Sequence, residues 1–564
     1  MPYRFSAAVL LATAALVPST ALAVPDGFAQ DVDALIAATV DQSGPGVSVV
    51  VTEDGKVVYQ GARGMAQIAE GRPIEPDTLF RLGSITKQFA AAVVVQLAEE
   101  GQLSLDDPLS KFVPDYPASG AAVTVRQLLN HTSGIPSYTS MPGWINDANL
   151  TRTWTTQDMI GQFRDRPSDF APGERYLYNN SGYILVGAVI EAVTGKPWDQ
   201  AVAERIAVPL GLSTIASFAD EATLPDMATG YTSGDDGKAE IAGPIDATVP
   251  AAAGALRGNV LDLARWADAL HGGNVVGEEY YRQMVARTVL NDGKEEAYGF
   301  GLGVEPVRGR PAIGHGGGIN GFNTASVYIP GDGIFVAVFN NTDSPEISSN
   351  TLMARIAAMA IGDPFEEFDA VALDLAAVAP LLGEYRIDEA QARKFYERDG
   401  KLYTLRTGGR ESEVFPAGGD RFFYAPYNPT WFAITRTEDG TLRMEMHHNG
   451  ANEPEIARWA GQIEAAPAVT IAPEVLQSYA GTYSGPIGAL ILSVDSAGTL
   501  MAQLGGQPKL PLVPQGPARF MVTGVDAFVD MLLEGDKVTG AVIGQGGQTI
   551  PFTRTEDTGE QPAD

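Results

Sequence analysis

The sequence contains no cysteine among its 564 residues. Disulfide bonds, thiol catalysis and cysteine-ligated metals are therefore excluded. Basic residues are also scarce, because 38 Lys and Arg stand against 69 Asp and Glu, and the formal net charge is −31. Proteins that bind nucleic acid or anionic membranes need a basic face for the phosphate groups, so we expect neither as a partner.

Long apolar runs are missing after the first residues. Residues 1–23 hold a single basic residue, Arg4, then an apolar run at 7–17, and end in Ala-Leu-Ala. This pattern is typical of a secretory signal peptide, and it predicts a mature chain that begins at Val24 and is periplasmic or secreted. No later segment reaches about 18 uninterrupted apolar residues, so we expect no membrane span.

Two common catalytic signatures are absent. The chain has neither a Gly-x-Ser-x-Gly elbow nor a Walker loop, which removes the support for an α/β-hydrolase or a nucleotide-dependent enzyme. One Ser-x-x-Lys match, Ser84 with Lys87, opens an apolar segment that ends at Gly101. We predict a buried helix here, with the hydroxyl and the amine on one face.

The start of that helix suits nucleophilic chemistry. Free N–H groups and the positive end of the helix dipole would let the Ser84 N–H stabilise an oxyanion. Burial would lower the pKa of Lys87, which makes it a usable base near neutral pH. The alternative interpretation is a helix cap followed by a surface lysine.

A second candidate is the only Tyr-x-Asn in the chain, Tyr178 with Asn180, on a loop before a helical segment. A tyrosine beside a lysine cation can act as an acid or a base. The alternative is a buried aromatic ring with a polar tip.

A third candidate is His315, which stands among four glycines in the segment 313–318. Glycine is costly in a strand unless something must approach the backbone closely. A substrate lying along this strand, with the Gly318 N–H as a second oxyanion donor, would explain the glycines. A flexible loop is the competing interpretation.

The remaining histidine candidates are weaker. His131, at the end of a short helix over 124–129, is either a general base or, as we favour, a structural residue bonded to the last helical carbonyls. His447 and His448 are neighbours on a predicted strand and point to opposite faces, so a joint metal site is not expected. No metal or cofactor is predicted.

The order of predicted elements indicates an α+β domain. Strands at both ends of the first 365 residues enclose a long helical stretch, and an Asp-Gly turn at 54–55 predicts a hairpin. The expected helices are 29–40, 84–101, 124–129, much of 155–210, and 261–271. The expected strands are 47–52, 57–60, 298–305, 325–329 and 334–340.

The pattern in the last third of the chain predicts short strands, among them 401–406, 430–436 and 442–447, which are separated by turns with Gly, Asp and Pro. A faint repeat at an offset of 98 residues places Tyr385 on Tyr483 and Phe422 on Phe520. This repeat predicts two similar small antiparallel β-barrels, with a linker at 461–473.

Three motifs now stand in order: Ser84-Ile85-Thr86-Lys87, Tyr178-Asn179-Asn180 and His315-Gly316-Gly317. Together they resemble the motifs of the penicillin-recognising serine hydrolases, in particular the class C β-lactamase and D-aminopeptidase branch. The resemblance covers about residues 28–365.

The resemblance implies an antiparallel sheet flanked by helices, a helical subdomain, and a site between them. It also implies the D-aminopeptidase layout, in which two barrels follow the catalytic domain. We therefore expect a signal peptide at 1–23, a catalytic domain at 24–368, and barrels at 369–465 and 466–564, the last with a polar tail.

The resemblance also implies residue roles. Ser84 would be the acylated nucleophile, Lys87 the base or its partner, and Tyr178 the proton shuttle to the leaving group. Asn180 would hold the substrate amide, and Gly317 and Gly318 would contact the substrate. In many relatives the third motif begins with a lysine that holds a carboxylate, whereas His315 is mostly neutral near pH 7. This difference disfavours a β-lactam or a C-terminal carboxylate as the substrate.

The sequence thus predicts an exported serine hydrolase that cleaves amide or ester bonds of small peptides, D-residues among the candidates, through a Ser84 acyl-enzyme. The alternatives are a carboxylesterase, a β-lactamase or DD-carboxypeptidase, and a non-catalytic binder of peptides or cell-wall fragments. Neither the substrate nor the oligomeric state follows from the sequence.

Overall fold

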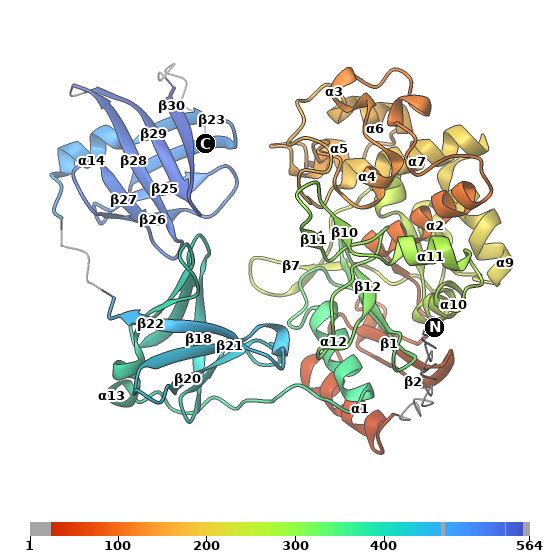
Figure 1. Ribbon diagram of the computed structural model, residues 1–564, viewed down its shortest axis with the longest axis horizontal. Coiled ribbons are helices and arrows are strands. Elements are labelled where there is room, and N and C mark those ends of the chain that lie inside the picture. The colour runs from red at the N-terminus through yellow and green to blue at the C-terminus, as the bar shows by residue number, and fades with distance from the viewer. Residues whose placement is uncertain (1–23, 464–468, 536, 556–564) are drawn as a thin grey trace, which may run out of the picture.

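The computed structural model describes residues 24–463, 469–535 and 537–555. Figure 1 shows a mixed domain of helices and sheet, followed by two barrels from the last third of the chain. This arrangement confirms the predicted fold class. The expected signal peptide at 1–23 and the end of the polar tail, 556–564, lie outside the described residues.

A five-stranded antiparallel sheet forms the centre of the first domain, in the order β12-β13-β14-β1-β2. Strands β1 and β2 come from the start of the chain, and β12, β13 and β14 come from beyond residue 312, so the two ends of the domain meet in one sheet. The strands are β1 (Val47–Glu53), β2 (Lys56–Arg63), β12 (Ile313–Ile319), β13 (Phe322–Ile329) and β14 (Ile334–Asn340).

The hairpin predicted at residues 54–55 is present, and the predicted strands at 325–329 and 334–340 form a second hairpin. The turn between β1 and β2 places Asp54 and Gly55 at φ 49° and 74°, which is the conformation that favours an Asp-Gly pair in two-residue hairpins. The hairpin of β13 and β14 turns over residues 330–333. β12 is an edge strand, which leaves one side of its backbone open to other partners.

The two faces of the sheet belong to two separate cores. Helices α1 (Phe28–Thr39) and α12 (Ser349–Ala360) cover one face, where they pack with Val49 and Val336 among others. The opposite face, with Val50 and Phe339, packs against the helical part of the domain. Successive strand residues alternate between the faces, as a doubly covered sheet requires.

The central helix α2 (Thr86–Glu99) follows a 3-10 turn at Gly83–Ile85 and lies almost wholly buried. It packs against α7 (Asn180–Thr194). Gly101, at φ 71°, follows its end as predicted. The sequence therefore placed this helix correctly, with Ser84 in the turn that leads into it.

Shorter elements complete the domain. The predicted helix at 261–271 is α10 (Val260–His271). The other helices are α3 (Ala118–Ala121), α4 (Val125–Leu129), α5 (Asp147–Leu150), α6 (Thr156–Phe163), α8 (Trp198–Val202), α9 (Val208–Leu210) and α11 (Glu278–Met284). The short strands are β3 (Met65–Gln67), β4 (Arg72–Pro73), β5 (Phe80–Arg81), β6 (Ala216–Ser217), β7 (Tyr231–Ser233), β8 (Ala239–Ile241), β9 (Leu256–Gly258), β10 (Thr288–Val289) and β11 (Glu295–Glu296).

The predicted strand at 298–305 is wrong. This segment forms a tight turn, in which Tyr298 bridges to Gly303 and Gly301 adopts a φ of 69°. A side chain at position 301 would run into the backbone carbonyl of Lys87. The turn is thus required by the close approach of the α2 backbone, which the apolar pattern did not reveal.

Two closed eight-stranded antiparallel barrels follow, as predicted. The first contains β15 (Gly383–Arg386), β16 (Ala392–Arg398), β17 (Lys401–Arg406), β18 (Glu411–Gly418), β19 (Arg421–Phe423), β20 (Trp431–Arg436), β21 (Leu442–His447) and β22 (Glu455–Gly461). The second contains β23 (Gly481–Gly485), β24 (Gly488–Val494), β25 (Leu500–Leu504), β26 (Leu510–Pro514), β27 (Arg519–Val522), β28 (Ala527–Glu534), β29 (Lys537–Gln545) and β30 (Gln548–Arg554). Short helices α13 (Leu375–Val378) and α14 (Pro473–Tyr479) precede them.

The repeat seen in the sequence corresponds to equivalent positions in the two barrels. Tyr385 and Tyr483 are both fully buried, and each donates a hydrogen bond of 2.6 Å to the carbonyl oxygen four residues before it. Phe422 and Phe520 are both core residues. The predicted domain boundaries stay predictions, and the one at 465–466 falls outside the described residues.

The first barrel docks on the catalytic domain through two buried arginines. Arg308 donates to the Gly450 carbonyl and pairs with Asp363 at 3.0 Å. Arg355 of α12 donates to the Tyr427 carbonyl at 3.2 Å and pairs with Glu367 at 3.0 Å. Loops of the barrel are thereby held against the catalytic domain.

In the described part of the chain no helix has the length and apolar character needed to cross a membrane.

Candidate active site

The structure brings the Ser-x-x-Lys pair together at the start of α2. Lys87 Nζ lies 3.1 Å from Ser84 Oγ. The lysine side chain is fully buried, while Ser84 is half-buried at the edge of a cavity. Burial depresses the pKa of Lys87 far below its usual value.

Two other oxygens surround the amine. The Asn180 Oδ1 lies 2.9 Å from Nζ and the Ala253 carbonyl oxygen lies 2.8 Å from it. Both can only accept hydrogen bonds. A neutral amine has two N–H donors and one lone pair, so when both donors serve these oxygens the lone pair faces Ser84. The serine O–H then donates to Nζ, which is the arrangement of a nucleophile and its base.

Helix α7 supplies the second motif. Asn179 caps this helix by accepting from the Gly182 N–H at 2.7 Å, and this cap fixes the residues on either side of it. Asn180 Nδ2 donates to Thr139 Oγ1 at 3.1 Å, which orients its Oδ1 toward Lys87. The family resemblance implies that Asn180 holds a substrate amide, and the structure adds the contact between its Oδ1 and the Lys87 amine.

Tyr178 precedes the cap and lies over the amine, with Lys87 Nζ 4.9 Å from its ring centre. Its Oη is buried and has no hydrogen-bond partner among the described residues. Burial raises the pKa of the phenol, and the nearby Ser84 hydroxyl opposes this rise. A protonated phenol at this place can carry a proton between Ser84 and a leaving group.

The third motif lies on the edge strand β12, next to the serine turn. A side chain at Gly317 would collide with the Leu82 carbonyl oxygen, which accepts a hydrogen bond of 2.9 Å from Thr324 Oγ1. Gly83, at φ 53°, packs against the backbone of Gly317 and Gly318. The glycines therefore allow the turn that carries Ser84 to lie directly on β12, and the flexible-loop interpretation is wrong.

The outer side of β12 provides the second oxyanion donor. Gly314 exchanges both of its backbone hydrogen bonds with Gly303, at 2.7 and 3.0 Å, on the side away from β13. Because strand residues alternate in direction, the backbone groups of Gly316 and Gly318 also face outward. The Gly318 N–H thus points toward the serine turn, where it can meet an oxyanion together with the Ser84 N–H.

His315 belongs to a buried chain of hydrogen bonds that the sequence did not reveal. Tyr298 Oη lies 2.8 Å from His315 Nε2 and 3.2 Å from His131 Nε2. The Asn179 N–H donates to His131 Nδ1 at 3.2 Å, so His131 Nε2 carries a proton and donates to Tyr298. Tyr298 then donates to His315 Nε2, and His315 Nδ1–H donates to the Gly316 carbonyl at 2.6 Å.

Burial disfavours the charged form of His315. Burial is the main cause that lowers the pKa of His315 to about 4. The Lys87 amine adds to this effect only when it is protonated, and the hydrogen bond to the Gly316 carbonyl opposes it. The pKa of His131 is also depressed, mainly by burial. His131 is structural as predicted, but it contacts Tyr298 and Asn179 and not the last helical carbonyls. No sequence motif surrounds Tyr298. The sequence therefore did not indicate its contact with His315, which lies 17 residues further along the chain.

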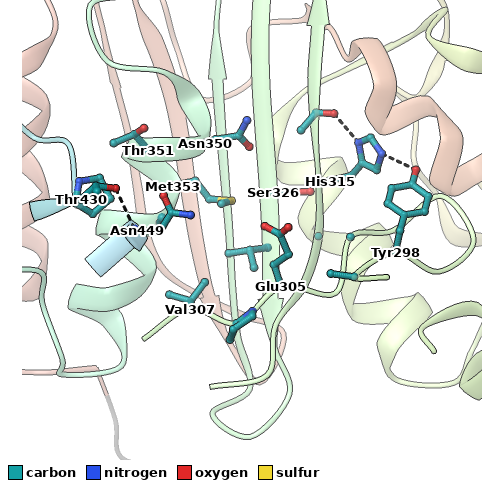
Figure 2. Close-up of a pocket in the computed structure, with 18 of the residues that line it drawn as sticks. Tyr298, Glu305, Val307, His315, Ser326, Asn350, Thr351, Met353, Thr430 and Asn449 are labelled. Atoms are coloured by element: carbon teal, nitrogen blue, oxygen red, sulfur yellow. Dashed lines mark hydrogen bonds between the residues drawn. The ribbon is translucent and has the colours of Figure 1, made fainter. Parts of the chain in front are cut away.

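These residues line two cavities, which have no lining residue in common. The smaller, about 170 Å³, contains Ser84, Asn180 and Gly318 and is otherwise walled mainly by apolar side chains. The larger, about 690 Å³, contains Tyr178 and His315 and reaches the first barrel, whose Thr430 and Asn449 close its far end (Figure 2). The candidate catalytic residues are therefore divided between the two cavities, with Ser84 in the smaller and Tyr178 and His315 in the larger.

No group of His, Cys, Asp and Glu with the arrangement of a metal site occurs in the described part of the chain. His447 stacks on Trp431 at 4.0 Å, and His448 Nε2 lies 3.2 Å from Glu455. The two histidines thus have separate structural partners.

Comparisons with known proteins agree with this geometry. Penicillin-binding protein 4* of Bacillus subtilis is 25% identical over 433 residues, covering 72% of this chain and 94% of that protein. A D-aminopeptidase of Cereibacter sphaeroides is 29% identical over 317 residues, which span 55% of this chain and 60% of the relative. Esterase EstB of Burkholderia gladioli is 34% identical over 180 residues, 30% of this chain and 45% of the esterase.

Solved structures match as well. An octameric penicillin-binding protein homologue from Pyrococcus abyssi has a TM-score of 0.55 and 25% identity, covering 74% of this chain and 97% of its own. A D-stereospecific amidohydrolase from Streptomyces sp. has a TM-score of 0.51 and 28% identity, covering 60% of this chain and 99% of its own.

A model of the Beta-lactamase family matches residues 32–358, which is more than half of the chain and includes all three motifs. The chain therefore belongs to the Beta-lactamase family, and it is a serine hydrolase of that family.

Proposed function

We propose that this protein is an exported serine hydrolase that releases amines or alcohols from small aminoacyl or peptidyl amides and esters, including those of D-residues. The reaction runs through an acyl-enzyme on Ser84. The observation that carries the proposal is the neutral His315 beside the Ser84–Lys87 pair. Because this imidazole is neutral, the part of the site that receives the leaving group has no cation to bind a carboxylate.

In the proposed acylation step, Ser84 Oγ bonds to the substrate carbonyl carbon and its proton passes to Lys87 Nζ. The oxyanion sits between the N–H groups of Ser84 and Gly318. The C–N or C–O bond then breaks, and Tyr178 passes the proton on to the departing nitrogen or oxygen. Water repeats the sequence on the acyl-enzyme and releases the acid.

The two cavities divide the substrate. Tyr178 faces the larger cavity, so the leaving group departs there, and the acyl part occupies the smaller one. The smaller cavity, at about 170 Å³ against 690 Å³, favours a short acyl part such as a single amino acid. D-aminopeptidase, D-stereospecific amidohydrolase and esterase among the similar proteins support the same substrate class.

A carboxylesterase is the second candidate. The apolar walls of the smaller cavity, with Ile145, Leu150 and Ile319 among them, favour simple acyl groups as well as aminoacyl groups. Export is proposed from the amino-terminal sequence pattern alone.

The first prediction tests the nucleophile. A fluorophosphonate should add one phosphonyl group to the protein, and Ser84→Ala should abolish the labelling because the only activated hydroxyl is gone. Mass spectrometry of the intact protein measures the adduct. Ser213→Ala, which changes an exposed serine far along the chain, is the control and should label normally. Full labelling of the Ser84→Ala protein would contradict the assignment.

The second prediction concerns the base. Lys87→Met should lower kcat/KM by at least about 100-fold, since general base catalysis typically contributes this much. In the unaltered protein, kcat/KM should fall as the pH drops through the depressed pKa of Lys87, because protonation removes the lone pair that faces Ser84. A pH profile that rises only near 10.5, the usual lysine value, would show that Lys87 is not the base.

The third prediction concerns Tyr298, a positioning residue. Tyr298→Phe leaves His315 Nε2 without its donor, so the imidazole loses one of the two hydrogen bonds that orient it, and kcat/KM should fall about ten-fold. The ring nitrogens of His315 should also shift in ¹⁵N NMR spectra. Tyr281→Phe removes a similar phenol, 2.7 Å from His271 Nδ1 and outside the site, and should leave kcat/KM unchanged. Equal behaviour of the two variants would make Tyr298 merely structural.

The fourth prediction decides the substrate class. D- and L-aminoacyl p-nitroanilides and p-nitrophenyl esters should be turned over faster than nitrocefin or a D-Ala-D-Ala peptide, because no lysine stands at the third motif to hold a carboxylate. The kcat/KM values measured side by side provide the test. Fastest turnover of nitrocefin or of the D-Ala-D-Ala peptide would favour the β-lactamase or carboxypeptidase alternative instead.

A further inference from the structure

We infer that the larger cavity is a subsite for positively charged leaving groups, and that Glu305 determines this specificity. The inference rests on the proposed function, since it names the class of leaving group that the same site releases. It concerns the compartment that Tyr178, Tyr298 and His315 share with the first barrel.

The chemistry of the site assigns this compartment to the leaving group. Tyr178 lines it, and the buried Oη of Tyr178 has no hydrogen-bond partner among the described residues. A buried hydroxyl that lacks a hydrogen-bond partner and lies near Ser84 can bond a ligand atom that reaches the nucleophile. The atom that needs a proton when the scissile bond breaks is the leaving nitrogen or oxygen, and it therefore enters here.

The charges that line the cavity all have one sign. Its lining residues include Glu296 and Glu305 but no lysine or arginine. Lys294 pairs with Glu296 at 2.5 Å, whereas Glu305 forms no salt bridge or hydrogen bond with any described residue. Figure 2 shows the Glu305 carboxylate reaching into the space between β12, with His315, and helix α12, with Met353. Glu305 is thus a solvent-exposed carboxylate that lines the compartment and has no protein partner among the described residues.

Three nearby arginines have other partners. Arg287 donates to the Val304 carbonyl at 3.1 Å and lies 3.5 Å from Glu295. Arg308 and Arg355 use their guanidinium groups on barrel carbonyls and on Asp363 and Glu367. The barrel wall itself contributes the neutral side chains of Asn428, Thr430 and Asn449. The charge of Glu305 therefore faces solvent and any ligand that enters the compartment.

Aromatic rings add to the preference for a cation. Tyr176 and Tyr298 line the cavity with their ring centres 5.6 Å apart. The pKa of Tyr176 is raised to about 12, mainly by burial and further by the negative charges of Glu305 and Glu296. Aromatic faces beside a carboxylate attract ammonium groups, and the formal charge of −31 favours the approach of cations over anions.

A matched pair of esters tests this inference. Butyrylcholine and 3,3-dimethylbutyl butyrate share the acyl group and the shape of the leaving group, and differ only in one positive charge. The wild-type protein should hydrolyse the choline ester with a kcat/KM about five-fold higher, the size expected for one partly exposed ion pair. Glu305→Gln should bring the ratio of the two kcat/KM values close to one.

Two further variants sharpen the result. Glu438→Gln makes the same change of charge in the turn between β20 and β21, at the far end of these strands from Thr430, and should keep the five-fold ratio. Glu305→Lys should reverse the preference, so that the carboxymethyl ester of butyric acid becomes a better substrate than the choline ester.

The outcomes separate the two proposals. Hydrolysis of the neutral ester by the wild type, and not by Ser84→Ala, supports the proposed function whatever the charge preference. A wild-type ratio of one or below overturns the inference alone. A five-fold ratio that survives in both Glu305 variants overturns the role of Glu305. Failure of the wild type to cleave either ester, without labelling of Ser84, overturns the proposed function and the inference together.

Discussion

The burial of the Lys87 amine is the constraint on which the rest of the site depends. An ammonium ion without solvent is costly, and the surrounding oxygens do not carry a full negative charge to pair with it. Asn180 Oδ1 and the Ala253 carbonyl accept hydrogen bonds from the amine, and the third oxygen near the amine belongs to Ser84. The least costly state is the neutral amine, which turns its lone pair to the serine. A single desolvation effect thus produces both the low pKa and the direction of proton transfer.

This constraint extends to the elements around α2. The amine must meet groups from α7 and from the 3-10 helix at Ala251–Ala253, so those segments pack directly on the buried helix. On the other side, the Leu82 carbonyl rests on Gly317 and holds the serine turn against β12. The backbone of an edge strand, which is normally a liability, is here covered on one part by Gly303 and left open at Gly318 for a substrate.

The sequence predicted the elements that local chemistry determines. The Asp54-Gly55 hairpin, the buried helix after Ser84 and the two repeated barrels follow from turn residues, apolar patterning and internal periodicity, and all are present. The three motifs could be found because each combines reactive residue types at fixed spacing. The structure brings their side chains together, and the proposed experiments test the role of each residue.

Other features depend on contacts between distant segments and leave little trace in the sequence. The turn at 298–303 was predicted as a strand because its apolar residues suit one, whereas the approach of the Lys87 backbone to Gly301 imposes the turn. Tyr298 bonds His131 and His315 from positions 167 and 17 residues away, a geometry that no local pattern encodes. Docking of the barrel through Arg308 and Arg355 is equally hidden, since a buried arginine looks like a surface one in a sequence.

The electrostatics of the cleft separate the chemistry from the selection of substrates. Burial lowers the pKa of Lys87 and of His315, which disfavours a fixed cation at the catalytic centre, and the Tyr298 contact orients the His315 ring. The nucleophile and base would therefore work on any acyl group that reaches them. In the proposed function, selection then falls to the two cavities: the small apolar one would limit the acyl part, and the acidic one, which the barrel borders, would disfavour carboxylates. A change of substrate would require altered charges at positions such as 305 and 315, with the Ser84–Lys87 pair left intact.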